Sequence, residues 1–322
     1  MAKPKIVLVM PLFEADEGTR AMTPPGFDLV VAGAGTPEYK AAIADAEYLV
    51  GFVDMLIKED LYKSAPKLKL IQLLSAGYDR ADLGAARKYK VPVANNGGAN
   101  SVAVSEHALM LMLAVSRQLI RQHTNVSGGR WRGNKAPPIH ELMRRTLGIV
   151  GLGTIGKKTA RLAKAFGMTV NYYDVARLTE AEEDALGVRF RLFRELLHTS
   201  DVVSLHVPLN DTTRGLVGAA ELALMKPGAI LVNTSRGPVV DEAALYDALT
   251  SNKLFGAGLD VFAEEPPPPN HPFFSLDNVV LTAHLAGPTQ ESSVSRLRNG
   301  FDNCERVARG ETPLWVIPEL GA

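Results

Sequence analysis

The sequence of 322 residues contains a single cysteine, Cys304. One cysteine excludes an intrachain disulfide and any metal site built from several thiolates. Net charge is also absent, because 35 Lys and Arg residues are balanced by 35 Asp and Glu residues. The chain as a whole therefore has no positive field with which to hold nucleic acid or an anionic membrane surface, and we expect neither as a partner.

Long apolar runs are absent as well. No run approaches the roughly 20 residues that a membrane helix needs. The apolar stretch at residues 6–10 ends at Pro11 and is followed by Glu14 and Asp16, so it is too short for a signal peptide and typical of a buried first strand. His, Cys and acidic residues do not cluster with the spacing of a metal site, so we expect no metal. A soluble, cytoplasmic protein is the expectation.

What is present is an alternation of short β-branched runs and helical stretches, the pattern of βαβ units in a parallel sheet. The length suggests two domains, since a domain usually has roughly 100–200 residues. In the first third, strands are predicted at residues 5–10, 27–31, 48–53 and 68–74, with helices at 38–46 and 83–90. Residues 101–123 contain no Gly or Pro and are rich in Ala, Leu and Met, so they are predicted to form one helix of about six turns.

A second α/β series follows a turn-rich connector at residues 128–138. Its strands are predicted at residues 147–150, 168–173, 201–206, 229–233, 256–260 and 279–282, and its helices at 154–166 and 241–249. A last helix is predicted over residues 292–310. The pattern thus predicts two α/β halves, joined by the long helix and by a return of the last helix to the first half.

Three glycines, Gly151, Gly153 and Gly156, form the pattern G-x-G-x-x-G between a predicted buried strand and a predicted helix. The first glycine permits the tight turn, the second lets the backbone approach a pyrophosphate, and the third lets helix and strand pack closely. The start of the helix offers free N–H groups and the positive end of its dipole. This context predicts a dinucleotide site.

Asp174 ends the next predicted strand and selects between the two nicotinamide dinucleotides. Its carboxylate can accept both ribose hydroxyls of NAD and repels the 2′-phosphate of NADP. NAD is therefore the predicted cofactor. Arg177, three residues further on, is the one feature that favours NADPH, so an NADPH-preferring enzyme stays open as an alternative.

Three charged residues each follow a predicted buried strand: Arg236 in N-T-S-R-G, Glu265 in D-V-F-A-E-E-P and His284 in T-A-H. Parallel strands end at one edge of their sheet, where the ligands of α/β proteins bind. Together with the glycine loop, these motifs resemble those of the D-2-hydroxyacid dehydrogenase family, which includes phosphoglycerate dehydrogenase and the glyoxylate/hydroxypyruvate reductases. The resemblance covers residues 70–290 in order and the first 70 residues mainly in pattern.

The resemblance implies two Rossmann-like doubly wound domains with parallel sheets. Residues 1–100 and 288–322 would form the substrate-binding domain, and residues 101–287 would form the NAD-binding domain inserted into it. The resemblance also implies a homodimer, with the helix that begins at Ser101 near the subunit contact.

The family's site residues carry over position by position. The implied catalytic residues are Arg236, Glu265 and His284; Glu265 is chosen over Glu264 because the family's glutamate immediately precedes the proline. Arg236 and His284 would also bind substrate, together with Ser75, Ala76 and Gly77, whose N–H groups can form an anion nest. The implied cofactor-binding residues are Gly151, Gly153, Thr154, Ile155, Gly156, Asp174, His206, Val207, Pro208, Thr234, Ser235 and Asp260.

The residue types fit the reduction of a 2-oxo acid. The ordinary pKa of histidine, about 6.5, suits a proton donor to the carbonyl oxygen. A carboxylate at Glu265 would favour the charged imidazolium of His284, and the guanidinium fork of Arg236 can hold the substrate carboxylate and polarise the carbonyl.

Some positions and one rival class stay open. Met55, Tyr78 and Trp131 are predicted to line the pocket for the substrate side chain. No role is assigned to His107, His123, His140, His198 and His271. The alternative from another class is an NAD(H)-sensing binding protein, because the corepressors related to this family share its fold and its three charged residues.

Overall fold

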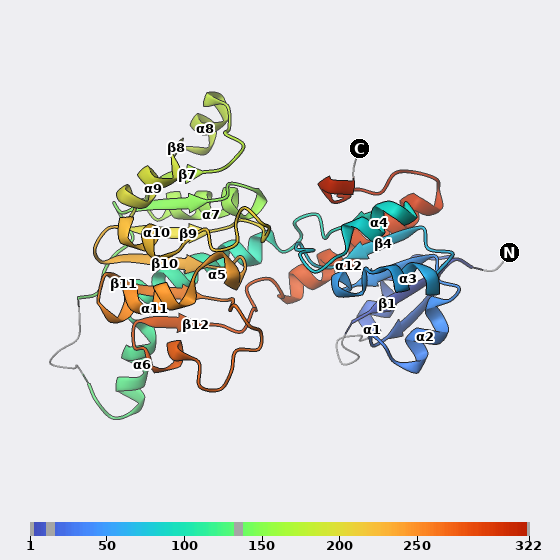
Figure 1. The fold of residues 1–322 in the computed structure, drawn as a ribbon, viewed down its shortest axis with the longest axis horizontal. Helices are drawn as coiled ribbons and strands as arrows, with labels where there is room; N and C mark the ends of the chain where they lie inside the picture. Colours follow the sequence, from blue (N-terminus) through green and yellow to red (C-terminus); the bar gives the residue numbers. More distant parts are fainter. Residues whose placement is uncertain (1–2, 11–16, 132–137, 321–322) are drawn as a thin grey trace. The chain divides into compact units, whose positions relative to one another are not determined.

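The computed structural model describes residues 3–10, 17–131 and 138–320. The chain divides into two compact units, the first formed by residues 1–100 with 288–322 and the second by residues 101–287 (Figure 1). Each unit contains one parallel sheet, so the predicted fold class, two parallel-sheet α/β domains, is confirmed. Within the described ranges, no helix has the length and apolar character needed to cross a membrane.

Five parallel strands form the sheet of the first unit, in the order β2-β1-β3-β4-β5. Both faces of the sheet are covered, because Val7 and Val9 pack into a cluster with α2, α3 and α4 while Ile6 and Leu8 pack into a cluster with α12. The strands are β1 (Lys5–Val9), β2 (Asp28–Ala32), β3 (Tyr48–Gly51), β4 (Leu70–Leu73) and β5 (Val93–Ala94). The helices are α1 (Glu17–Ala21), α2 (Pro37–Ile43), α3 (Glu59–Ser64), α4 (Leu83–Tyr89) and α12 (Gln290–Ala308).

Seven parallel strands form the sheet of the second unit, in the order β12-β11-β10-β9-β6-β7-β8. The chain leaves β6 toward β7 and later returns to β9 on its other side, which makes the carboxyl end of β6 a topological switch point. The strands are β6 (Thr146–Val150), β7 (Thr169–Tyr173), β8 (Val188–Phe190), β9 (Val202–Leu205), β10 (Ala229–Asn233), β11 (Leu254–Leu259) and β12 (Val279–Leu281). The helices are α5 (Ser101–Ser116), α6 (Leu119–Ser127), α7 (Thr154–Ala165), α8 (Glu180–Leu186), α9 (Phe193–Thr199), α10 (Ala219–Leu224) and α11 (Glu242–Thr250).

The prediction of one unbroken helix over residues 101–123 is wrong. The chain forms α5 and α6, separated at Gln118, whose φ of 50° is left-handed. The physical reason lies in burial: α5 packs its apolar side chains against the sheet and α7, whereas α6 buries no residue within the described part of the chain. Beyond Gln118 no buried side chain among the described residues of α6 holds the chain in line with α5, so the helix ends there and α6 begins in another direction.

The other predicted strands and helices are confirmed, with ends that differ by a few residues. The structure adds two short strands, β5 and β8, and several short helices that the hydrophobic pattern did not indicate, among them α3, α8, α9 and α10. Part of the connector, residues 132–137, lies outside the described residues. The elements that carry the glycine loop and the three charged residues, β6, α7, β7, β9, β10, β11 and β12, lie in the second unit, whereas the predicted nest at residues 75–77 follows β4 in the first unit.

Candidate active site

The glycine loop joins β6 to α7, and two of its glycines are required by the packing of the chain on itself. Gly151 has a φ of 92°, and a Cβ there would lie 2.7 Å from the carbonyl oxygen of His206. A Cβ on Gly156 would lie 2.3 Å from the carbonyl oxygen of Gly151. Gly153 differs, because a Cβ at this position would have no described atom within 4 Å, so open space faces its backbone.

The first turn of α7 is built to receive an anion. Gly153 is its N-cap residue and supplies no side-chain cap, so Thr154, Ile155 and Gly156 carry the unsatisfied N–H groups of a helix N-terminus. These N–H groups and the helix dipole attract negative charge. The space beside Gly153 is where a pyrophosphate would fit.

Asp174 follows β7 and is fixed beside the glycine loop. Its Oδ2 accepts a hydrogen bond from the amide of Leu152 at 2.7 Å, and its Oδ1 accepts one from the amide of Ala176 at 3.1 Å. Arg177 is directed elsewhere: its Nε donates to Glu183 at 2.9 Å, and its guanidinium lies over the ring of Phe190. The carboxylate of Asp174 is thus held at the loop while Arg177 is bound to α8, an arrangement that suits the ribose of NAD.

Two buried polar atoms near the ends of β9 and β10 have no hydrogen-bond partner among the described residues, namely Nδ1 of His206 and Oγ1 of Thr234. His206 bonds through its other nitrogen to Ser204, 2.9 Å away, and burial lowers its pKa to about 4, so its ring is neutral near pH 7. Buried polar groups usually have partners. These two atoms therefore fit a bound cofactor that supplies the missing hydrogen bonds.

The remaining predicted cofactor residues flank these atoms. Val207 and Pro208 follow His206 in the loop after β9, where Val207 packs against Gly151. Ser235 donates from both its amide and its hydroxyl to Asn233, at 3.0 Å and 2.7 Å. These two hydrogen bonds fix the conformation of the loop after β10.

Arg236 lies in that same loop, which Asn233 organises. Nδ2 of Asn233 donates to the carbonyl oxygen of Arg236 at 2.9 Å, and Nη1 of Arg236 donates to the carbonyl oxygen of Ser235 at 2.8 Å. The next residue, Gly237, touches the backbone of Phe262, and a Cβ there would lie 1.9 Å from the carbonyl carbon and oxygen. Only glycine allows the Arg236 loop to approach the loop that carries Glu265 so closely.

Glu265 and His284 are in direct contact. Oε2 of Glu265 lies 2.7 Å from Nδ1 of His284, and Oε1 accepts from the amide of Phe262 at 3.0 Å. Burial alone would raise the pKa of Glu265, but the hydrogen bonds from His284 and Phe262 and the charge of Arg236 outweigh it and hold that pKa below its ordinary value. The carboxylate is therefore ionised near pH 7, and Nδ1 of His284 is the donor.

The Nε2 atom of His284 makes no hydrogen bond within the described residues, and the side chain is 46% exposed. The backbone of His284 has a φ of 55°, an uncommon value for a residue other than glycine. A half-exposed imidazole with one nitrogen bound to a carboxylate and the other unoccupied can exchange a proton with a ligand.

Asp260 holds the loop that carries His284. Its carbonyl oxygen accepts from the amide of His284 at 2.8 Å, and its carboxylate accepts from the amides of Leu285 and Ala286, both at 2.9 Å. The hydroxyl of Thr282 donates to the same carboxylate at 2.6 Å. Asp260 was predicted only as a cofactor contact, and these contacts to its own chain were not predicted. The sequence does contain a sign of the contact between Asp260 and Thr282, because the two residues directly follow two strands that pair in the sheet.

The predicted substrate nest lies in the first unit, in the loop after β4. Oγ of Ser75 donates to the carbonyl oxygen of Gly77 at 2.8 Å. The amides of Ala76 and Gly77 donate no hydrogen bond within the described residues, so they are available to an anion.

The residues predicted to line the side-chain pocket differ from one another. The hydroxyl of Tyr78 donates to Glu319 at 3.0 Å, and burial together with Glu319 raises the pKa of Tyr78 to about 12. Met55 is half exposed in the first unit, whereas Trp131 belongs to the second unit and is 76% exposed. Among the residues that the structure describes, Tyr78 alone of the three has a side-chain hydrogen bond, and its partner Glu319 belongs to the C-terminal segment.

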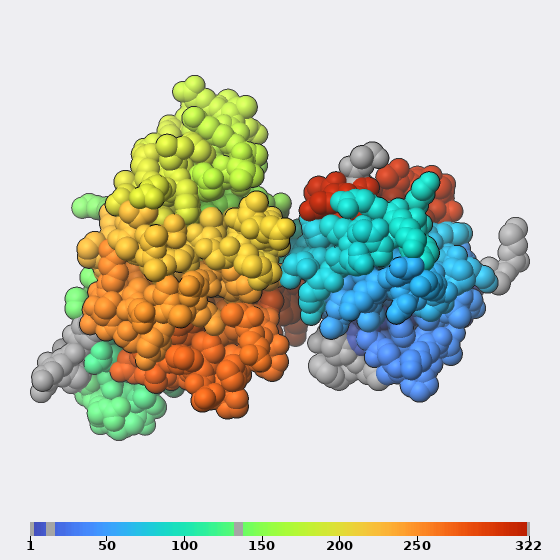
Figure 2. Space-filling view, in the orientation of Figure 1, coloured from blue at the N-terminus to red at the C-terminus, as the bar shows by residue number. Residues whose placement is uncertain are grey.

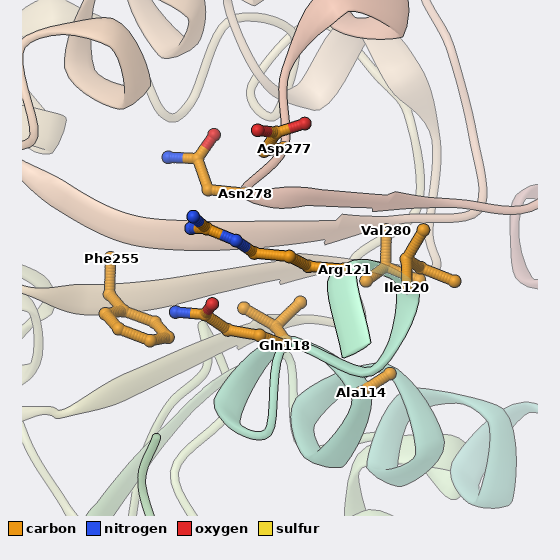
Figure 3. A pocket seen from close by; sticks show the side chains of 9 residues that line it. Ala114, Gln118, Ile120, Arg121, Phe255, Asp277, Asn278 and Val280 are labelled. Atoms are coloured by element: carbon orange, nitrogen blue, oxygen red, sulfur yellow. The ribbon is translucent and has the colours of Figure 1, made fainter. Parts of the chain in front are cut away.

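Figure 3 shows a small hollow away from the predicted site, where α5 ends and α6 begins. It has a volume of about 20 Å³, room for roughly one water molecule. Gln118 and Arg121 face Phe255 and Asn278 across it. None of the predicted site residues lines it, and it marks the break between the two helices.

Comparison with known proteins shows which proteins this chain resembles. The family described as "D-isomer specific 2-hydroxyacid dehydrogenase, NAD binding domain" matches residues 109–286. The glyoxylate reductase of Korarchaeum cryptofilum is 39% identical over 84% of this chain and 82% of its own length, and that of Thermococcus litoralis is 41% identical over 84% and 83%. The structure of D-lactate dehydrogenase from Aquifex aeolicus, complexed with NAD and lactic acid, is 28% identical, covers 95% of this chain and 96% of its own, and has a TM-score of 0.82.

The two parallel-sheet units and the glycine loop define a dinucleotide-binding α/β oxidoreductase. Within that class, the chain belongs to the D-isomer-specific 2-hydroxyacid dehydrogenase family. The resemblance seen in the sequence is thus confirmed, as are the enzyme class, an oxidoreductase acting on CH–OH groups, and the cofactor, NAD.

Proposed function

We propose that the protein reduces a small 2-oxo acid, of the glyoxylate or hydroxypyruvate type, to the D-2-hydroxy acid. The observation that carries this proposal is the contact of 2.7 Å between Glu265 and Nδ1 of His284, which leaves Nε2 of an imidazole available to a ligand. The names of the relatives, glyoxylate reductase and hydroxypyruvate reductase, support the substrate class.

NADH supplies the hydride when it is bound. The residues that would hold it are those of the glycine loop and the first turn of α7 for the pyrophosphate, Asp174 for the adenosine ribose, and His206 and Thr234 through their unpartnered atoms. Open space at Gly153 and the absence of a side-chain cap on α7 support this assignment.

His284 donates the proton. In its charged form Nδ1–H points to Glu265 and Nε2–H is given to the carbonyl oxygen of the substrate, which becomes the hydroxyl of the product. The ionised carboxylate of Glu265 stabilises the imidazolium before the transfer and fixes the ring orientation during it. In the opposite direction, neutral His284 accepts the hydroxyl proton through Nε2.

Arg236 binds the substrate carboxylate and polarises its carbonyl. The guanidinium presents donors in a rigid fork, which suits two oxygen atoms of one substrate. Its positive charge stabilises the negative charge that develops on the carbonyl oxygen. The amides of Ala76 and Gly77, which donate no hydrogen bond within the described residues, support the first unit as the substrate-binding domain, with residues 101–287 as the NAD-binding domain.

The subunit state and location belong to the same proposal. The exposed apolar side chains of α5 and α6 support a homodimer in which this surface meets a second copy of the chain. The cytoplasm is the proposed location, because it supplies NAD and keeps the single buried thiol of Cys304 reduced.

The deciding experiment is a panel of glyoxylate, hydroxypyruvate and pyruvate, each assayed with NADH and with NADPH. We expect steady turnover with NADH, a higher kcat/KM than with NADPH, and a smaller difference in Asp174→Ala. His284→Ala should lose turnover while it still binds NADH. Binding of NADH without turnover of any of the three acids would favour a corepressor-type NAD(H)-sensing protein. A higher kcat/KM with NADPH than with NADH would favour an NADPH-preferring glyoxylate or hydroxypyruvate reductase.

A further inference from the structure

His107, to which the sequence assigns no role, reaches the loop of His284 from α5, most of whose residues are buried. Its side chain is 15% exposed, and its Nε2 lies 2.9 Å from Oγ1 of Thr282 and 3.5 Å from Oδ1 of Asp260. Thr282 directly follows β12, and Asp260 directly follows β11. Three elements of the second unit therefore meet in one hydrogen-bonded cluster behind His284.

The direction of each hydrogen bond in this cluster follows from counting protons. The hydroxyl of Thr282 has one proton, and it donates that proton to the carboxylate of Asp260 at 2.6 Å. Oγ1 of Thr282 is then the acceptor toward His107, so Nε2 of His107 carries a hydrogen. Burial lowers the pKa of His107, although Asp260 opposes the shift. The ring is thus the neutral tautomer with its proton on Nε2.

The cluster bears on His284 because Asp260 contacts three consecutive residues of its loop. The amides of His284, Leu285 and Ala286 all donate to Asp260. His284 has a φ of 55°, a conformation that persists in a residue of this kind only where its surroundings hold it. The carboxylate of Asp260 holds the amides of the two residues that follow His284, so whatever fixes this carboxylate also restrains the backbone that carries the imidazole.

We propose that His107 is a positioning residue for His284, acting through Thr282 and Asp260. The N–H group of His107 fixes the hydroxyl of Thr282 in the rotamer that donates to Asp260. It thereby ties the loop at residues 282–286 to α5, which packs in the core of the second unit. This inference rests on the proposed function, in which His284 is the proton donor. A shift of about 1 Å in a reacting group can cost up to a hundredfold in rate, so the tie matters for catalysis.

The first test replaces His107 with residues that lack or keep the donor. His107→Phe keeps a ring but has no N–H, and we expect kcat to fall about tenfold, with the KM for the 2-oxo acid and the Kd for NADH within about twofold of the wild type. His107→Gln carries an amide N–H on a chain of similar length and should recover most of the lost kcat. His198→Phe, the same exchange at an exposed histidine of α9, is the matched control and should leave kcat unchanged.

The second test is a double-mutant cycle with Thr282→Val, which removes the hydroxyl and keeps the shape. If His107 acts through that hydroxyl, His107→Phe should cost little further kcat in the Thr282→Val background. If His107→Phe does not fold, His107→Asn takes its place, because the shorter amide does not reach Thr282. The thermal midpoint is measured for each variant, so that a loss of folded protein is not read as a loss of kcat.

The outcomes separate this inference from the proposed function. His284→Ala without turnover, together with a His107→Phe enzyme of normal kcat, would overturn the role of His107 alone. Additive losses in the cycle, or a His107→Gln enzyme as slow as His107→Phe, would also overturn it. A near-normal His284→Ala enzyme would overturn the proposed function and this inference with it.

Discussion

At the scale of single residues, Glu265 supplies the negative charge beside the imidazole of His284. Its pKa lies below the ordinary value, so the carboxylate keeps its charge from neutral pH down into the acid range. In the proposed reaction His284 gives up its proton as an imidazolium, and the ionised carboxylate of Glu265 beside Nδ1 stabilises that charged form.

Glu265→Gln tests this coupling through the pH profile of kcat/KM for reduction. The amide keeps a hydrogen-bond acceptor 2.7 Å from Nδ1 but removes the negative charge, so the imidazolium loses stabilisation. We expect partial activity and an alkaline limb displaced to lower pH. Glu264→Gln, which neutralises the exposed neighbouring carboxylate, is the control and should leave the profile in place. An alkaline limb that stays put in Glu265→Gln would contradict the pairing.

Arg236→Lys tests whether shape matters as well as charge. Lysine keeps the positive charge but lacks the two-pronged fork, so it cannot hold the carboxylate and polarise the carbonyl together. We expect kcat/KM to fall by roughly two orders of magnitude or more, the scale of a lost transition-state contact. Arg194→Lys, an exposed exchange on α9, controls for the substitution itself. A lysine enzyme within a few-fold of the wild type would assign substrate binding to another residue.

At the scale of elements, close backbone approach explains why the loops of the site contain glycine. Gly237 lets the loop after β10 touch Phe262, in the loop that carries Glu265, whereas a Cβ at Gly153 would meet no described atom within 4 Å. Gly237 is therefore required by the packing of the protein on itself. Gly153 instead leaves space for a ligand at the start of α7.

The paired substitutions Gly237→Ala and Gly153→Ala distinguish these two uses. A Cβ at Gly237 would lie 1.9 Å from the Phe262 carbonyl, so Gly237→Ala should lower the free energy of unfolding by about 1–3 kcal/mol and reduce activity. Gly153→Ala should leave that free energy almost unchanged and weaken NADH binding. Denaturant titration and NADH fluorescence measure the two effects. Equal destabilisation by both substitutions would refute the distinction.

Sequence predicted the elements of the site well because each motif follows a buried β-branched strand, such as β10 before Arg236. The prediction from sequence failed where contacts between distant parts of the chain determine the structure. The break at Gln118 has no glycine or proline to mark it and follows from the end of burial along α5. His107 and Thr282 are far apart in the sequence and meet only because α5 packs beside β12. A single histidine in a helix gives no sign of such a contact.

At the scale of the whole molecule, α6 is the element least explained by one copy of the chain. None of its residues is buried within the described part of the chain. Its apolar side chains Leu119, Ile120 and Val126 are each more than half exposed to solvent. Figure 2 shows α6 as the green segment at the lower margin of the second unit. On α5, Val102 is 52% exposed and Met110 is 44% exposed. An amphipathic helix with an uncovered apolar face is typical of a subunit interface.

The proposed homodimer predicts a specific response to charge on α6. The wild type should sediment with twice the mass of the 34.7 kDa chain, and the double variant Leu119→Glu with Ile120→Glu should sediment as a single chain, because two carboxylates cannot be buried in the contact without partners. Leu192→Glu, at an apolar side chain of 66% exposure before α9, is the matched control and should remain a dimer. Since α6 buries nothing within one described chain, the double variant should also keep the thermal midpoint of the isolated subunit. A wild type that sediments as one chain at micromolar concentration would contradict the homodimer. A double variant that stays dimeric would place the subunit contact outside α6.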